Sequence, residues 1–461
     1  MCTCLIAGKH ATKSGRVLLA ANDDWDKVCG ILAHTPRRTH APDATHLLTA
    51  GGRIPQIAET CGYVYTACDY SIGTLKRGWN CGVNDRGVAA AGTGASAFKE
   101  IKTDGAMLEP DDILLLILAR AETARSGIRM IGDLLERHGL NCSGWDECAS
   151  MATYAVADSE EGWWLEVAPG NHWIAVRVPD DEVSVRENAF GIHDADLTDE
   201  ENVMCSAGLA EFARQQGWWD GDIRHFDFAV AYGSDVSPNE WGPELDKMNM
   251  RRRWRAMNLL SGQEMDENVT LYSVKPNRLL TEEDLKDVLR DAYEGSAYDL
   301  SKAPDAGRYG NPFHDDPPDY SLCRSWTVAS FVADLRKGTP SVMWVCMGCP
   351  KTGFYLPLYA DISGLPACCE ETDAQKESLF RRFQELHYLT CRRYSENLPL
   401  VEGIRTAFER EAAGELAAMD AALAVRSPQE RRERQTEFSA GQVRRALEVC
   451  RKTKAALLDC Y

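Results

Sequence analysis

The sequence predicts an α+β protein in which antiparallel strands form the core, two helices are inserted among them and further helices follow toward the C-terminal end. Short apolar runs alternate with turn residues in residues 2–23 and 153–188, a pattern typical of antiparallel hairpins and meanders. Helical periodicity dominates residues 109–139 and most of the chain after Glu370. No linker-like stretch divides the 461 residues, so we expect one large compact unit.

The first two strands form a predicted hairpin. "CTCLIAG" has the apolar character of a strand, "KHATKSGR" is a polar turn, and "VLLAAND" is the returning strand. A second hairpin is predicted in "WNCGVNDRGVAAAGTGA", where "NDRG" forms the turn between two short apolar runs. The small residues from Ala89 to Ala95 would let another element, or a substrate, approach this backbone closely.

Helices and a strand meander follow. Asp111 and Asp112 suit the N-terminal end of a helix, and Gly139 suits a C-terminal stop. We expect Ser126-Gly127 to divide this helical segment into two. The meander at residues 153–188 has "DSEEG", "APGN" and "PDDE" as its turns.

The second half of the chain returns to strands and then to helices. "MRRRWRAMNLL" has the pattern of a helix. Three apolar runs predict strands at residues 327–335, 341–348 and 354–360. The helical pattern after Glu370 is heavily charged, and we expect it to be interrupted at Pro399 and Pro428.

Charge and hydropathy narrow the range of partners. The chain carries 51 Lys and Arg residues against 70 Asp and Glu residues, a formal net charge of −19. A negative surface repels a phosphate backbone, so we expect no nucleic acid partner. No apolar run reaches the roughly 18 residues of a membrane span, and the start of the chain lacks the features of a secretory signal. We therefore expect a cytoplasmic protein with no membrane partner; whether it forms a homo-oligomer is left open.

The 17 cysteines are then expected to be mainly reduced thiols. Cys346 and Cys349 have the spacing of zinc ligands, and Cys368 and Cys369 are adjacent. However, no second Cys-x-x-Cys pair and no matching pair of histidines accompanies them. "VMWVCMGCP" is an apolar run ending in proline, so we interpret these cysteines as small buried residues and expect no metal site.

Two cysteines, Cys2 and Cys4, lie at the very start of the chain. A thiol needs a base before it becomes a nucleophile, and a cysteine at a chain terminus can use its own α-amino group, whose reference pKa is about 8. Removal of Met1 would create that terminus at Cys2, whereas Cys4 would require the loss of three residues. Position alone also fits ordinary thiols on an edge strand, both facing the same side.

The motifs taken in order resemble a known family. "MCT", "SGRVLLAANDD" and "GVNDRGVAAAG" are similar to the N-terminal-nucleophile hydrolases of the C69 dipeptidase family, which is related to bile-salt hydrolases and penicillin V acylases. The likeness continues through residues 111–139 and 154–188, "HDADLTDEENV", "RRRWRAMNLL" and "SVMWVCMGCPKTGFYLPLYADI". These markers extend from Met1 to about Ile362, and the helices beyond match the family only in character.

This resemblance implies a four-layer αββα sandwich, with two antiparallel sheets flanked by helices. We expect residues 1–366 to form the catalytic core and residues 367–461 to form a helical region packed on it. The implied activity is hydrolysis of the amide bond in dipeptides with broad side-chain tolerance, without a metal or organic cofactor. Two alternatives stay open: an amidase acting on N-acyl amino acids or conjugated bile acids, and a catalytically silent binding protein similar to the secernins.

The resemblance also assigns roles to particular residues. Cys2 matches the nucleophile, and its freed amine matches the base. Asp24 matches a carboxylate that holds this amine in the related acylases, with Asp23 as the second choice; without the family, "NDDWD" would be interpreted as a solvated acidic turn. Asn188 matches a side-chain donor to the oxyanion, although an asparagine is also common where a strand ends.

Two further matches complete the expected site. Gly94 falls where the acylases use a backbone N–H for the oxyanion, and a glycine can supply that N–H but no side chain. Arg252 matches an active-site arginine, although the run Arg251, Arg252 and Arg253 leaves the register uncertain by one and such arginines are often exposed. One departure is clear: Ala21 occupies a position where the family commonly has an arginine, so a positive charge near the nucleophile is missing.

Overall fold

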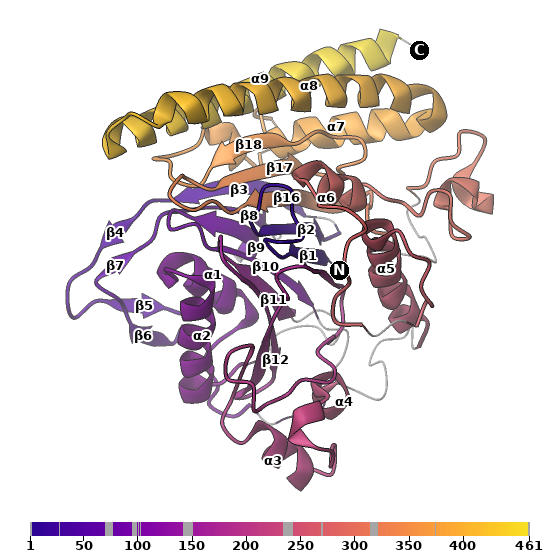
Figure 1. The fold of residues 1–461 in the computed structure, drawn as a ribbon. Coiled ribbons are helices and arrows are strands. Elements are labelled where there is room, and N and C mark those ends of the chain that lie inside the picture. Colours follow the sequence, from indigo (N-terminus) through magenta and orange to yellow (C-terminus); the bar gives the residue numbers. More distant parts are fainter. Residues whose placement is uncertain are drawn as a thin grey trace.

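Two large antiparallel sheets face each other at the centre of the protein, and helices cover both outer faces (Figure 1). The structure is a computed structural model. It describes residues 2–26, 28–69, 77–94, 99, 101, 103–141, 151–233, 243–268, 271–313, 321–373 and 375–459. The expected four-layer αββα sandwich is confirmed by this arrangement.

The first sheet has six strands and contains both strands of the predicted first hairpin. Its strand order is β14 (Val183–Arg186), β1 (Thr3–Ala7), β2 (Leu18–Asp24), β16 (Thr327–Asp334), β17 (Val342–Met347) and β18 (Leu356–Tyr359). The strand β1 therefore lies between two hydrogen-bonded neighbours, β14 and β2. The three late strands that the apolar runs predict are confirmed as β16, β17 and β18.

The second sheet has eight strands. Its order is β15 (Val203–Cys205), β13 (His172–Arg177), β12 (Gly162–Ala168), β11 (Met151–Ala157), β10 (Ala89–Gly94), β9 (Arg77–Asn84), β8 (Tyr63–Asp69) and β3 (Cys29–Thr35). The predicted second hairpin is β9 and β10, and the meander is β11 to β14, whose last strand joins the six-stranded sheet. The strands β3, β8 and β15 are not anticipated from the sequence pattern. Two small ribbons, β4 (Arg38–Thr39) with β7 (Glu59–Thr60) and β5 (Thr45–Leu47) with β6 (Arg53–Pro55), complete the strands described.

The inner faces of the two sheets approach closely because small residues line β10. The strand β1 packs against β10, β11 and β12, and β2 packs against β9, β10 and β11. Cys4 directs its Sγ toward the carbonyl of Gly92 at 3.8 Å. A Cβ atom on Gly162 would lie 2.4 Å from the side chain of Ile6, so only glycine fits at that crossing.

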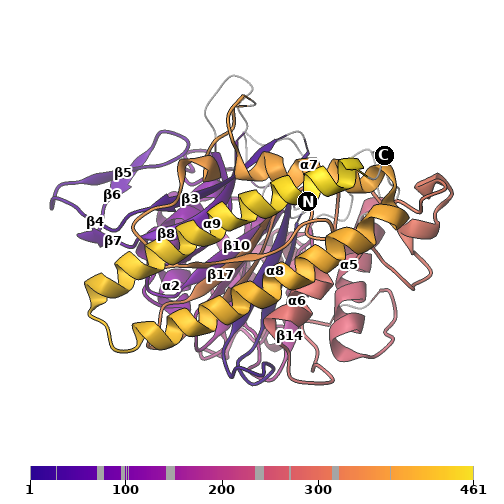
Figure 2. The ribbon, with the colours of Figure 1, turned by 90° about the horizontal axis from the view of Figure 1, so that it is seen from above.

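Helices form the two outer layers. The eight-stranded sheet is covered by α1 (Pro110–Arg120) and α2 (Ala124–His138). The six-stranded sheet is covered by α5 (Pro243–Ser261), α6 (Glu282–Leu289), α7 (Leu379–Arg392), α8 (Tyr394–Leu423) and α9 (Pro428–Asp459). Figure 2 shows α8 and α9 side by side across that face. The shorter helices are α3 (Leu209–Gln215), α4 (Phe228–Tyr232) and 3₁₀ turns at Ile223–His225, Leu300–Lys302, Pro304–Ala306 and Ala367–Cys369. None of the described helices has the length and apolar character that crossing a bilayer requires.

Two expected helix boundaries are wrong. The helical pair divides at residues 121–123, where Thr123 caps α2, and not at Ser126-Gly127; Ser126 lies inside α2 and completes the capping box. Pro399 does not interrupt the C-terminal helices but lies inside α8, near its start, where it removes only one backbone N–H bond. Pro428 does mark a boundary, since it is the first residue of α9.

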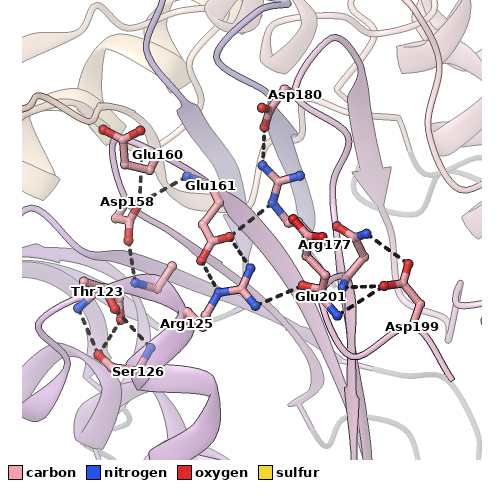
Figure 3. A network of polar contacts seen from close by, with 12 residues as sticks. Thr123, Arg125, Ser126, Asp158, Glu160, Glu161, Arg177, Asp180, Asp199 and Glu201 are labelled. Atoms are coloured by element: carbon pink, nitrogen blue, oxygen red, sulfur yellow. Dashed lines mark hydrogen bonds and ion pairs between the residues drawn. The ribbon is translucent and has the colours of Figure 1, made fainter. Parts of the chain in front are cut away.

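A polar network anchors the start of α2 to the edge of the meander (Figure 3). Arg125 donates two hydrogen bonds to the carboxylate of Glu161, at 2.9 and 2.7 Å, and Arg177 donates a third at 3.1 Å. Asp158 accepts a hydrogen bond from the backbone N–H of Ala124 at 2.7 Å, which satisfies a free donor at the helix N-terminus. The network therefore fixes α2 against β12 and β13 at one end.

Replacing glycine by alanine should have opposite effects on stability at two helical positions, Gly132 in α2 and Gly414 in α8. A Cβ atom on Gly132 would lie 2.2 Å from the Trp173 ring, so Gly132→Ala should destabilise the fold by about 1–3 kcal/mol. Gly414 is an exposed residue within α8, and a Cβ atom added there would meet no other atom within 4 Å. Gly414→Ala should therefore stabilise the fold by about 0.5–1 kcal/mol. Urea unfolding of both variants measures the difference, and a stable Gly132→Ala protein would contradict the packing described.

Candidate active site

Cys2 lies immediately before β1, the second strand from one edge of the six-stranded sheet, and is only 4% exposed. The pairing of Thr3 with Asn22 in the β1–β2 ladder places Cys2 opposite Asp23. Successive side chains of a strand point to opposite faces, so Cys2, Cys4 and Asp23 share the inner face that meets the eight-stranded sheet. The shared face of the two cysteines agrees with their spacing in the sequence.

The thiol of Cys2 contacts the carboxylate of Asp23. Cys2 Sγ lies 3.5 Å from Asp23 Oδ1, and Cys68 Sγ, from β8 in the facing sheet, lies 3.7 Å from Asp23 Oδ2. Each thiol donates to one carboxylate oxygen. The buried carboxyl group of Asp23 therefore lies between the thiols of Cys2 and Cys68.

Burial sets the protonation of this pair. It raises the pKa of the Cys2 thiol to about 12, and the negative charges of Asp23 and Asp24 act in the same direction. It also raises the pKa of Asp23 to about 7, with the charge of Asp24 as the second cause. The resting thiol is therefore neutral at pH 7, so nucleophilic attack requires a base that takes its proton as the reaction proceeds.

Asp24 lies on the other face of β2. Its Oδ1 accepts a hydrogen bond from the hydroxyl of Thr327 at 2.7 Å, and its Oδ2 lies 3.7 Å from Arg324 Nε. Burial raises the pKa of Asp24, and Arg324 opposes this shift. The two candidate carboxylates are thus separated by the strand alternation: Asp23 faces the thiol, and Asp24 faces a cation and a hydroxyl.

Arg252, from α5, is fully buried and binds the backbone of Cys2. Its Nη1 donates to the carbonyl of Cys2 at 2.6 Å and to the hydroxyl of Thr3 at 2.9 Å. Its Nη2 donates to Asn188 Oδ1 at 2.7 Å and to Asn249 Oδ1 at 2.6 Å. Burial, followed by the charge of Arg324, lowers the pKa of Arg252 to about 10, so it stays cationic at pH 7.

The neighbouring arginines have other partners. Arg251 lies over the ring of Tyr298, 3.6 Å from its centroid, and Arg253 Nη2 lies 2.9 Å from Glu187 Oε1. Among the contacts described for these three arginines, the hydrogen bond to Cys2 comes from Arg252.

Asn188 follows β14 and is held in one orientation. An arginine can only donate, so the oxygen of the Asn188 amide faces Arg252 and its nitrogen points the other way. That nitrogen, Nδ2, donates to Thr93 Oγ1 at 3.1 Å, which uses one of its two N–H groups. The carbonyl of Asn188 accepts from Asn249 Nδ2 at 3.2 Å.

Thr93 and Gly94 close the site from the end of β10. The hydroxyl of Thr93 lies 3.4 Å from the carbonyl of Cys2 and 3.3 Å from that of Glu187. The β10–β11 register is irregular between Thr93 and Gly94, and Gly94 is buried as the last residue of the strand. The structure thus brings Cys2, Asn188 and Arg252 into one network with Thr93, and Gly94 is the next residue along the chain.

Several contacts of the site are not anticipated from the sequence. They involve Cys68, Thr93, Asn249, Arg324 and Thr327. The contact between Cys2 and Asp23 has only a partial signal in the sequence: the hairpin predicts that the two strands pair, but the register that places Cys2 opposite Asp23 comes from the structure. The contact between Asn249 and Arg252 is local, since the two lie three residues apart on α5. The other contacts depend on how distant segments pack, for which the sequence pattern carries no signal.

Ala21, Cys346 and Cys349 are buried. Ala21 is buried in β2 and pairs with Cys4 and Phe331, so this position supplies no charge. Cys346 and Cys349 are buried, which confirms their interpretation as buried thiols. Across the described ranges, no group of three or more His, Cys, Asp or Glu side chains is arranged to hold a metal ion.

Comparison with known proteins gives a consistent group of relatives. The model of a family described as "Peptidase family C69" matches residues 1–406. A protein named "Dipeptidase" from Bifidobacterium longum (strain NCC 2705) is 27% identical over 427 residues, covering 82% of this chain and 74% of its own. A "Probable dipeptidase" from Latilactobacillus sakei is 26% identical over 384 residues, covering 78% and 74%, respectively.

A third relative and one solved structure extend the comparison. "Dipeptidase A" from Lactobacillus helveticus is 23% identical over 431 residues, covering 89% of this chain and 85% of its own. A crystal structure of a mutant conjugated bile acid hydrolase from Clostridium perfringens covers 78% of this chain and 92% of its own, with 12% identity and a TM-score of 0.33.

Replacing Arg252 should expose its role in holding the site together. Arg252→Met leaves the buried acceptors on Cys2, Asn188 and Asn249 without their donor, so we expect a loss of about 3 kcal/mol or more in the free energy of unfolding. Arg251→Met, one residue away, removes a contact with Tyr298 and should cost less than about 1 kcal/mol. Urea unfolding followed by tryptophan fluorescence compares the two, and equal losses would refute the special place of Arg252.

The raised pKa of Asp23 predicts a pH-dependent effect on stability. Its carboxyl ionises near 3.8 in the unfolded chain and near 7 in the fold, so its stabilising share is present below pH 4 and is lost as the pH rises through 7. Asp23→Asn cannot ionise and should gain stability relative to wild type between pH 4 and pH 8, by up to about 4 kcal/mol. Unfolding measured at both pH values tests this, with the exposed Asp133→Asn as the control. A stability difference between Asp23→Asn and wild type that does not change with pH would show that burial does not raise the pKa of Asp23.

Proposed function

Because the chain belongs to peptidase family C69, and is therefore a hydrolase of peptide bonds, we propose that it is a dipeptidase whose nucleophile is the thiol of Cys2. The observation that carries this proposal is the way the fold fixes Cys2. Its carbonyl accepts a hydrogen bond from Arg252, whose guanidinium also orients the amide of Asn188. These contacts hold Cys2 in one position, as a nucleophile requires.

The first step is activation of the thiol. In the proposed mechanism, Met1 is removed and the α-amino group of Cys2 becomes the base. With a pKa of about 12, the buried thiol does not ionise on its own at pH 7. An amine with a reference pKa of about 8, attached to the same residue, can accept the proton as sulfur attacks. Asp24 holds this amine, and its contacts with Thr327 and Arg324 support that role by fixing the carboxylate.

The second step is formation of a thioester. The Sγ of Cys2 attacks the carbonyl carbon of the substrate amide, and the carbonyl oxygen becomes an oxyanion. Asn188 Nδ2 and the backbone N–H of Gly94 donate to this oxygen. The amine of Cys2 then gives its proton to the leaving amine as the C–N bond breaks. Water attacks the thioester, the C–S bond breaks, and a proton returns to sulfur.

The proposed substrates are dipeptides with a broad choice of side chains. The relatives from Bifidobacterium longum and Lactobacillus helveticus bear the name dipeptidase, and their alignments cover 82% and 89% of this chain. Those names support the same substrate class here. The scheme uses a sulfur nucleophile and an amine base, so it requires no metal or organic cofactor.

We also propose that residues 1–366 form the catalytic core and that residues 367–461 are a helical region packed on it. In support, the site residues lie between Cys2 and Thr327, while α7 contacts β17 and α8 and α9 contact β18 from outside. A cytoplasmic location is supported by the described cysteines, all of which are free thiols, as expected in a reducing compartment.

Substitution of Cys2 tests the proposed nucleophile. We expect Cys2→Ala to lower kcat on a dipeptide panel by at least about a thousandfold, because no other group can form the thioester. Cys4→Ala is the matched control: Cys4 lies two residues further along, on the same face and also buried, and should keep activity within a few-fold. Full activity of Cys2→Ala would exclude the proposal.

Intact-mass measurement tests the base separately. The active protein should lack Met1, since the α-amine of Cys2 is blocked while Met1 remains attached. Fully active protein that retains Met1 would leave Cys2 as the nucleophile but rule out its amine as the base.

A further inference from the structure

Arg324 is a buried guanidinium beside Asp24 that the sequence motifs do not single out and whose effect on the charge of Asp24 the proposed scheme does not address. It lies in the segment that leads into β16, and it is 5% exposed. Its Nε lies 3.7 Å from Asp24 Oδ2, and both side chains are almost completely enclosed. A charge pair at this depth is weakly screened by solvent, so each member strongly affects the ionisation of the other.

Thr327 links the same two residues by a second route. Its hydroxyl donates to Asp24 Oδ1 at 2.7 Å and accepts from the backbone N–H of Arg324 at 3.2 Å. Arg324 Nε also donates to the carbonyl of Ser321 at 3.1 Å, which fixes the guanidinium within its own segment. One carboxylate oxygen of Asp24 is therefore bound by Thr327, and the other faces Arg324.

The register of the six-stranded sheet builds this arrangement. Thr327 pairs with Asp24 at the first position of β16, and the ladder is irregular between Thr327 and Ala329. Asp24 is the last residue of β2, on the outer face of the strand. The start of β16 thus brings a hydroxyl and a guanidinium to the strand end where the carboxylate lies.

Besides the α-amino group at the start of the chain, which also favours the ionised carboxylate, the charged groups around Asp24 come from four segments. Arg324 precedes β16, Arg252 is on α5, Asp23 is its neighbour on β2, and the thiol of Cys2 precedes β1. Arg252 is already bound to Cys2, Thr3, Asn188 and Asn249. Among these groups Arg324 is the largest influence that favours the ionised carboxylate, and it acts against burial and against Asp23.

We propose that Arg324 is a positioning residue that keeps Asp24 ionised and aimed at the amine of Cys2. It acts through Asp24 and does not touch the substrate. This inference rests on the proposed role of Cys2 and its amine.

The test compares Arg324→Gln with Arg324→Lys. Loss of the charge should raise the pKa of Asp24, so the acid limb of kcat/KM against pH should move up by about 1–3 pH units in Arg324→Gln. KM should change less than kcat, since no substrate contact is lost. Arg324→Lys keeps the charge, so the acid limb of its kcat/KM profile should lie close to the wild-type position.

Arg336→Met is the control variant. Arg336 lies just beyond the other end of β16 and is paired with Asp334 and Asp420, at 2.6 and 2.8 Å. Its loss also removes a largely buried ion pair from the same region, but it should leave the acid limb unchanged. If Arg324→Gln does not fold, Thr327→Val replaces it, because it removes the hydroxyl between Arg324 and Asp24 and should shift the limb in the same direction.

A second readout separates this inference from the function on which it rests. The rate of Cys2 alkylation by iodoacetamide, followed by peptide mass spectrometry, reports the pH dependence of the thiol without any substrate. Its acid limb should move together with that of kcat/KM. If the acid limbs of both pH profiles stay at their wild-type positions in Arg324→Gln, or in Thr327→Val, the proposed role of Arg324 is wrong. A wild-type protein that cleaves no dipeptide would instead overturn the proposed function, and the alkylation profiles would still decide on Arg324.

Discussion

Four hydrogen bonds from one buried guanidinium hold the start of β1, the end of β14 and the helix α5 in a fixed relation. Arg252 directs them to a carbonyl, a hydroxyl and two side-chain amides, and none goes to a carboxylate. Removing an arginine from water costs several kcal/mol, so the arrangement is stable only if its donors are well satisfied. Because the guanidinium is planar and rigid, satisfying it also sets the distance between Cys2 and Asn188. The geometry of the site thus follows from a requirement of the fold.

The alternation of side chains along β2 determines what its two carboxylates can do. Asp23 points inward, between the thiols of Cys2 and Cys68. Asp24 points outward, toward Thr327 and Arg324. Two adjacent residues of the same type therefore meet different environments, which is how a fold separates the proton affinities of paired acids. A shift of one residue in the strand register would exchange these environments.

The sequence predicts the two hairpins, the meander and the late strands because their signals are local, whereas β3, β8 and β15 are not anticipated. The alternation in β1 and β2 and the "NDRG" turn belong to single segments. The register of the first hairpin is less accessible, since a ten-residue connection joins Ala7 to Leu18 and permits many alignments. Arg324 and Thr327 are about 300 residues from Asp24, and their contacts with it arise from the pairing of β16 with β2. Such contacts depend on sheet order, and no local pattern encodes it.

The terminal residues of a chain are ordinarily poorly ordered, whereas Cys2 is buried and held by hydrogen bonds. The strand β1 is hydrogen-bonded on both sides, by β14 and by β2. The carbonyl of Cys2 is approached by Arg252 from the outer helical layer and by Thr93 from the facing sheet. Contacts from both faces and both edges therefore converge on one residue. An α-amine can serve as base to a thiol on the same residue only if that residue keeps a single conformation, because each rotation about its bonds would separate substrate, thiol and amine. The position of β1 inside the sheet provides that constraint.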